Sequence, residues 1–149
     1  MSNLHSLRSA SGLLLRMAVF AASVSPCVAE LSPLQRLCVD RGIVAEERIA
    51  ACTALIRSGE GNPHNVAVSL LNRGAAYGLR GDHDLALADF DNAIQLDPGF
   101  AAAYNLRSIA WRNKGDLDRA IADAGTAIRL NPSFGPAWAS RGAAYGKKG

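Results

Sequence analysis

The sequence predicts an all-helical fold built from a repeated pair of helices, and three observations support this. Alanine dominates the apolar residues of the second half of the chain, which favours closely packed helices over a sheet-based core. The same region repeats itself with a period of 34 residues. Glycine and proline recur at fixed places within the period, where each residue type tends to end a helix. A period of this length is typical of stacked helix pairs.

The repeat is visible when the chain is compared with itself at a shift of 34 residues. Residues 67–100 and 101–134 are identical at 14 of 34 positions, whereas about 2 identities are expected by chance. The positions that recur include Arg73, Arg107 and Arg141; Tyr77, Trp111 and Tyr145; Gly81, Gly115 and Gly149; Ala86 and Ala120; and Pro98 and Pro132.

The spacing within one unit is specific. The first unit reads Leu70-x2-Arg73-Gly74-x2-Tyr77, followed by Ala86-x3-Phe90 and Pro98. This pattern resembles the tetratricopeptide repeat. The resemblance covers residues 66–149, as repeats 66–99 and 100–133 and a half repeat 134–149. It implies an all-α, tetratricopeptide-repeat helical solenoid of antiparallel helix pairs, preceded by a short helical segment.

The resemblance places the first helix of each unit at about 66–79, 100–113 and 134–147, and the second at about 83–96 and 117–130. Gly74 would let the paired helices approach closely, with Ser108 and Gly142 in the same place. Tyr77 and Trp111 would fill the gap between helices. Asp82 and Asp116 could cap the second helices.

The repeated arginines have acidic residues in the same register. Arg73 and Arg107 are each followed sixteen residues later by an aspartate, Asp89 and Asp123. Since the acids recur with the arginines, a repeated structural ion pair is the favoured interpretation. A ladder of arginines that grips a ligand carboxylate is the alternative.

Residues 1–29 have the features of a secretory signal peptide. Arg8 and Arg16 are the only charged residues, an apolar stretch covers residues 17–24, and small residues surround Cys27. A mitochondrial transit peptide and an uncleaved membrane anchor are the alternatives. With this segment removed, the chain would be periplasmic or secreted, with no stable membrane insertion.

Residues 30–65 do not repeat and form an expected helical cap. A helix should begin at Ser32-Pro33, a second should span about Ala45 to Arg57, and Asn62-Pro63 should begin a linker. The segment holds Cys38 and Cys52, an even pair that suggests a disulfide bond in an exported protein. Two buried thiols are the alternative.

The cysteine-containing segment, with the run from Arg48 to Thr53, precedes repeats that start Asn-Arg-Gly-x-Ala-Tyr at Asn72. This arrangement resembles a group of exported repeat proteins of proteobacteria. The resemblance implies a periplasmic location and gives no reaction.

Several functional classes lack support in the sequence. The net charge is +3 over 149 residues, with no basic run that would bind nucleic acid. No nucleophile stands beside an orienting base, and the three histidines, with His64 and His83 expected in loops, have no metal-ligand spacing. We therefore expect no enzyme, no catalytic residue, no metal and no cofactor.

The expected function is a non-catalytic protein–protein interaction module, a periplasmic scaffold or adaptor that binds a polypeptide on the concave face of its repeats. Leu71, Ala75 and Leu106 stand where some relatives hold a ligand carboxylate, which argues against such a clamp. The candidate partner-binding residues are Asn72, Asn105, Ile109, Arg112 and Asn113. The alternative is a structural fragment or a self-associating unit of a longer array, which would use the open C-terminal edge around Trp138 and Tyr145.

Overall fold

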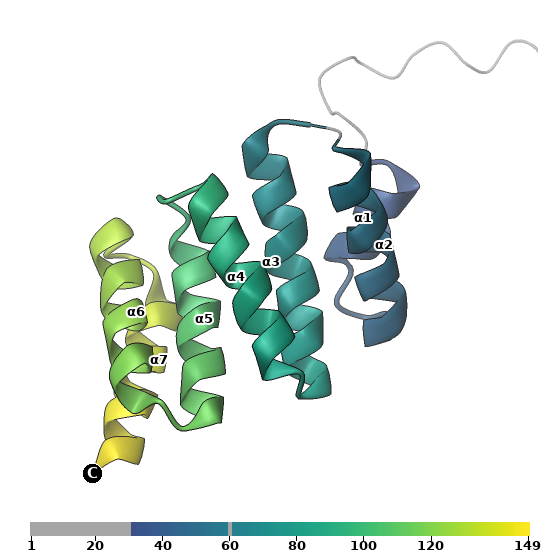
Figure 1. The fold of residues 1–149 in the computed structure, drawn as a ribbon. Coiled ribbons are helices and arrows are strands. Elements are labelled where there is room, and N and C mark those ends of the chain that lie inside the picture. The colour runs from purple at the N-terminus through teal and green to yellow at the C-terminus, as the bar shows by residue number, and fades with distance from the viewer. Residues whose placement is uncertain (1–30, 60) are drawn as a thin grey trace, which may run out of the picture. The chain divides into compact units, whose positions relative to one another are not determined.

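The computed structural model describes residues 31–59 and 61–149, and the predicted signal peptide with Cys27 lies outside them. The described residues form seven α-helices and no strands (Figure 1). The helices are α1 (Pro33–Val39), α2 (Ala45–Ser58), α3 (Pro63–Arg80), α4 (His83–Leu96), α5 (Ala101–Lys114), α6 (Leu117–Leu130) and α7 (Gly135–Lys148). The two second helices, α4 and α6, have the predicted bounds, and the first helices differ by one to three residues.

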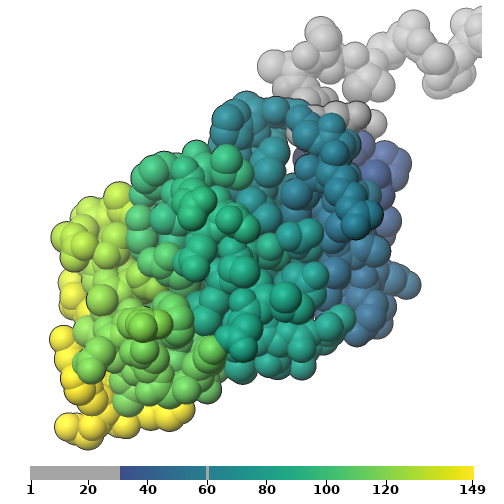
Figure 2. Space-filling view, in the orientation of Figure 1, coloured from purple at the N-terminus to yellow at the C-terminus, as the bar shows by residue number. Residues whose placement is uncertain are grey.

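Each helix packs mainly on its neighbours in the sequence. The pairs α3/α4 and α5/α6 each form one repeat, and α7 packs against α6 and α5. The colours in Figure 2 accordingly pass in sequence order from α2 through α4 and α5 to α7. In this arrangement, residues of α2, α3 and α5 border one common cavity.

Glycines and an aspartate set the turns inside each repeat. Gly81 and Gly115 have φ angles of 88° and 90°, in the left-handed region that a glycine adopts without strain. The Asp116 carboxylate caps α6 by accepting from the Arg119 amide at 3.1 Å. The corresponding prediction for Asp82 is wrong, because its side chain makes no cap hydrogen bond and pairs with Arg80 instead.

The segment before the first repeat is joined to it without a linker. The Asn62 side chain accepts from the Asn65 amide at 2.9 Å, and Pro63 is the first residue of α3. The predicted linker at Asn62-Pro63 is therefore wrong, since this pair is a helix cap and start. His64 and His83, which we expected in loops, lie in the first turns of α3 and α4.

The helices α1 and α2 pack around the two cysteines. Cys38 and Cys52 are buried, their Cα atoms are 4.8 Å apart, and their sulfur atoms are 2.15 Å apart. Ser32 begins α1 with a capping box, in which it exchanges hydrogen bonds with Gln35. Helix α1 has 7 residues, half the 14 of α5. Residues 40–44 therefore form a loop after α1 instead of further helical turns.

The contact between the helices of a repeat depends on small side chains. A Cβ atom at Gly74 would come within 2.7 Å of the Phe90 ring. In the second repeat the aromatic residue is replaced by Ala124, and the buried Ser108 fits, donating to the Ala120 carbonyl at 2.7 Å. The residue that faces the ring position therefore changes together with it: glycine faces phenylalanine in the first repeat, and serine faces alanine in the second.

Within residues 31–59 and 61–149, no helix is long and apolar enough to cross a membrane.

Candidate functional site

The repeated arginines lie between helices and are held by carboxylates. Arg73 donates from Nε and Nη2 to both oxygens of Asp89, at 2.8 and 2.7 Å. Arg107 binds Asp123 in the same way, at 2.7 Å for each bond, and also donates to Asp91 at 2.6 Å. The hydrogen bonds that Arg73 and Arg107 donate to Asp89 and Asp123 raise the pKa of both guanidinium groups above the ordinary value for arginine. These arginines are therefore occupied within the fold.

A cavity of about 360 Å³ lies where α2, α3 and α5 face one another. Its volume is within the range of small-ligand pockets, and it is large enough for one or two amino-acid side chains. Most of the wall is apolar, and Leu71, Leu79, Phe90, Leu106 and Ile109 supply it. Most of the lining residues belong to α3 and α5, and the loop before α2 contributes Arg41.

Polar groups are set into this apolar wall. Arg41, Arg48, Asn72, His83 and Asn113 line the cavity, and no acidic residue does so. Arg48 is only 4% exposed, and its Nε atom has no hydrogen-bond partner within the described part of the chain. The Nδ1 atom of His83 is buried and unpartnered in the same way. The cavity thus combines an apolar wall with unsatisfied hydrogen-bonding groups.

The structure brings three of the five predicted partner-binding residues to this cavity. Asn72, Ile109 and Asn113 line it. Asn105 does not, because it is 5% exposed and lies inside the packed helices. Arg112 is half-buried outside the cavity wall, and its carbonyl accepts from Lys147. A role of Asn105 and Arg112 in binding a partner stays a prediction, and the cavity brings together only the other three residues.

Sequence reasoning missed Arg41, Arg48 and His83. Arg48 sits on a helix that was read for its apolar face, and nothing in the repeat pattern marks it. The one available signal was the local concentration of charge. Arg48 follows closely on Asp40, Arg41, Glu46 and Glu47 in the sequence. Only the packing of the helices shows that Arg48 is buried and lines the cavity.

Comparison with known proteins agrees with the architecture. Residues 67–100 match the sequence model of the tetratricopeptide repeat. The chain is also similar to the crystal structure of MamA, with 23% identity and a TM-score of 0.62 over 70% of this chain and 58% of that one. The fold is a tetratricopeptide-repeat solenoid.

Two other solenoids of this kind are solved with peptides. The first repeat domain of Spaghetti (RPAP3), bound to the HSP90 peptide SRMEEVD, is 23% identical over 69% of this chain and 79% of that one, with a TM-score of 0.62. The second repeat domain of human RPAP3, in complex with the HSP70 peptide SGPTIEEVD, is 27% identical over 68% and 81%, with a TM-score of 0.61. No curated protein sequence matches this chain.

The tetratricopeptide-repeat solenoid described here shows no metal site in residues 31–59 and 61–149, where no group of three or more His, Cys, Asp or Glu side chains could hold an ion.

Proposed function

We propose that this protein is a non-catalytic interaction module that binds a polypeptide segment in the cavity between α2, α3 and α5. The cavity carries the proposal, because it joins apolar contact surface to unsatisfied donors, the combination that fixes a peptide in one register. The peptide complexes of two similar solenoids support it. The exported location predicted from residues 1–29 makes the module a periplasmic scaffold or adaptor.

The proposal is tested by selecting binders from a random peptide library on the whole chain and on a blocked variant. Ala75 lines the cavity, so Ala75→Trp places an indole ring inside it. Ala88 is exposed on α4, so Ala88→Trp adds the same ring to a remote surface. The selected peptides should bind the parent and Ala88→Trp, and they should not bind Ala75→Trp.

Circular dichroism on both variants verifies that the helices are intact. Equal binding of the selected peptides to Ala75→Trp and to the parent would contradict the proposal, as would a failure to select any peptide.

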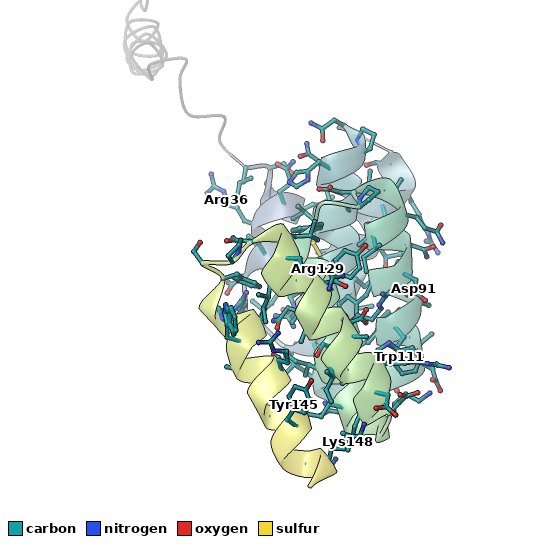
Figure 3. The ribbon with its side chains drawn as sticks, turned by 90° about the vertical axis from the view of Figure 1, so that its left-hand side faces the viewer. Arg36, Asp91, Trp111, Arg129, Tyr145 and Lys148 are labelled. Carbon is teal, nitrogen blue, oxygen red and sulfur yellow. A yellow bond between two sulfur atoms is a disulfide. The ribbon has the colours of Figure 1, made fainter. Side chains whose placement is uncertain are left out.

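The open face of α7 supports a second candidate function. Arg141, Gly142 and Tyr145 occupy the register of Arg73, Gly74 and Tyr77, which contact α4. At Gly142 a Cβ atom would meet nothing within 4 Å, and Tyr145 is 56% exposed. Figure 3 shows Tyr145 and Lys148 along this last helix. The face that a following helix covers in each earlier repeat is uncovered here.

Charge decides which occupant fits the α7 face. The Arg141 guanidinium stacks over the Trp138 ring, 4.5 Å from its centroid, and makes no salt bridge within the described residues. The charged side chains of α7 are all basic, so pairing two copies through this helix would bring groups of like charge near one another. We infer that the face binds a helix bearing an aspartate followed by an aromatic residue, as Asp89 and Phe90 do on α4.

A peptide with the sequence of α4, cross-linked to keep it helical, is the probe for this face. It should bind the whole chain, and either Asp→Asn in the peptide or Arg141→Gln in the protein should weaken binding about tenfold. The two changes together should add little, since both remove one ion pair. Additive losses, or no loss, would contradict the inferred pair.

Sedimentation tests the self-association alternative on the same protein. A dimer that forms at micromolar concentration and persists in Arg141→Glu would favour pairing of two copies over the acidic helix.

A further inference from the structure

Arg48 carries a buried positive charge without a partner. The residue is 4% exposed, its Nε atom has no hydrogen-bond partner within the described residues, and it lines the cavity. Burying a guanidinium without an acceptor is unfavourable, so native proteins pair or hydrate such groups. The partly buried arginines of the two repeats, Arg73 and Arg107, are both held bidentately by aspartates. Arg48 differs from these two arginines, because no carboxylate holds it within the described residues.

The nearby acids are engaged elsewhere. Asp40 accepts from the Gly42 amide at 2.7 Å within its own loop. Glu46 lies 3.9 Å from Arg80, which also pairs with Asp82. None of these acids lines the cavity, while a second cation, Arg41, does so from the loop before α2. The cavity therefore has two guanidinium groups and no counter-charge of its own.

The remaining wall restricts what anion would fit. Leu71, Leu106 and Ile109 bring apolar surface next to the arginines, and Asn72 and Asn113 add amide groups. A small hydrated anion would leave this apolar surface in contact with water. A carboxylate attached to an apolar group satisfies both parts, because it takes the guanidinium fork bidentately and buries its carbon atoms.

We propose that this cavity binds an acidic peptide, whose carboxylate pairs with Arg48 and Arg41 while a neighbouring apolar side chain contacts Leu71 and Ile109. The proposal rests on the peptide-binding function above and names the chemistry of the peptide. The cations come from α2 and its preceding loop. The first helices of the repeats supply the apolar and amide contacts.

The test uses a fluorescent peptide, Ser-Gly-Leu-Leu-Glu, and fluorescence anisotropy with the whole chain. Three relatives of the peptide separate the sources of charge: Glu replaced by Gln, the C-terminus amidated, and Glu replaced by phosphoserine. Binding should fall at least tenfold when the carboxylate that pairs with Arg48 is removed, from the side chain or from the C-terminus. Raised salt should weaken binding of the acidic peptide, and it should leave unchanged the binding of a fourth peptide that carries both the Gln and the amidated C-terminus.

Variants of the protein assign the effect to the cavity. Arg48→Gln should reduce binding at least tenfold, and Arg41→Gln, in an exposed loop, should reduce it in the same direction. Arg57→Gln is the matched control, because Arg57 is exposed in the last turn of the same helix and outside the cavity. It should bind as the parent does.

A stability measurement keeps the proposal falsifiable if binding is weak. Arg48→Met removes an unpaired buried charge and keeps the side-chain volume, so its thermal midpoint without peptide should equal or exceed that of the parent. A marked drop would show that Arg48 has a structural partner and would overturn the proposal.

The remaining outcomes separate this proposal from the proposed function. Equal binding of acidic and neutral peptides, or unchanged binding to Arg48→Gln, would overturn the proposed pairing of a carboxylate with Arg48. Either result would leave the proposed peptide binding in place. Preference for the phosphoserine peptide over both carboxylates would overturn it as well. Loss of all peptides, including those selected from the library, would contradict both.

Discussion

Arg73 of α3 and Asp89 of α4 face each other in a two-point ion pair, with donor–acceptor distances of 2.8 and 2.7 Å. A third guanidinium nitrogen donates to Thr53 of α2 at 3.1 Å. One side chain thus connects three consecutive helices. The same connection recurs at Arg107, which reaches Asp123 of its own repeat and Asp91 of the preceding one. Arginine at this register therefore couples neighbouring repeats.

Removing the carboxylate should destabilise the fold. Asp89 is 4% exposed, so Asp89→Ala leaves the Arg73 guanidinium partly buried and unpaired. We expect a loss of about 3 kcal/mol in the free energy of unfolding, measured by urea denaturation. Asp84→Ala is the control, because its ion pair with Lys114 is exposed and should contribute less than about 1 kcal/mol. Similar losses for the two variants would contradict this role of Asp89.

The arginine pairs should hold their contribution from neutral to mildly alkaline pH. Hydrogen bonds to the carboxylates raise the pKa of Arg73 and Arg107 above the ordinary value for arginine, so the folded state keeps these protons more tightly than the unfolded chain. Such a contribution is complete below the unfolded pKa and is lost only as the pH rises through the folded one. The difference in unfolding free energy between the parent and Asp89→Ala should therefore be constant in this window. A steady decline there would contradict it.

Gly74 and Gly142 share a register and should respond oppositely to alanine. Gly74→Ala forces a Cβ against the Phe90 ring, which costs about 1–3 kcal/mol of stability. Gly142→Ala meets open space within α7, and alanine favours a helix over glycine by up to about 1 kcal/mol. Chemical denaturation of both variants checks the pair. A loss of stability in Gly142→Ala would show that the open face of α7 is covered in solution.

A side chain at position 74 should be tolerated when the Phe90 ring is removed, because the second repeat has alanine at the ring position. Changing Gly74→Ser together with Phe90→Ala reproduces the pairing of Ser108 with Ala124. The double variant should be more stable than the sum of the two single effects predicts, by about 1 kcal/mol. Strict additivity would contradict the proposed exchange of space between these positions.

Much of the fold follows from local sequence. The glycines at 81 and 115 and the prolines at 98 and 132 punctuate the chain strongly enough to place α4 and α6 at their observed bounds. The arginine–aspartate register was readable because both members recur. By contrast, Asn62-Pro63 suits a linker and a helix start equally well, and only the packing of α3 on α2 distinguishes them.

The cavity was harder to predict, for a physical reason. Its wall comes from four helices and a loop, so its existence depends on how α2 stacks on α3 and on the short length of α1. Burial of Arg48 is a result of that stacking and leaves no mark on the local pattern. Asn105 shows the converse, because its polar side chain suggested a surface position, yet packing places it inside.

The cysteine pair predicts a stabilising cross-link between α1 and α2. With Cys27→Ser removing the third thiol, the unfolded, unreduced chain should show no free thiols. Reduction, or Cys52→Ala, should lower the free energy of unfolding by about 3 kcal/mol for a loop of this size. Two reactive thiols before reduction would contradict the bond.

Photocross-linking in cells measures whether a polypeptide occupies the cavity between α2, α3 and α5. A photoreactive amino acid replaces Ile109, which lines the cavity, or Gln95, which is exposed on α4. Position 109 should form a cross-link to one polypeptide, Arg48→Gln should reduce the yield of that cross-link, and position 95 should form none. Equal cross-linking at both positions, or none at 109, would contradict it.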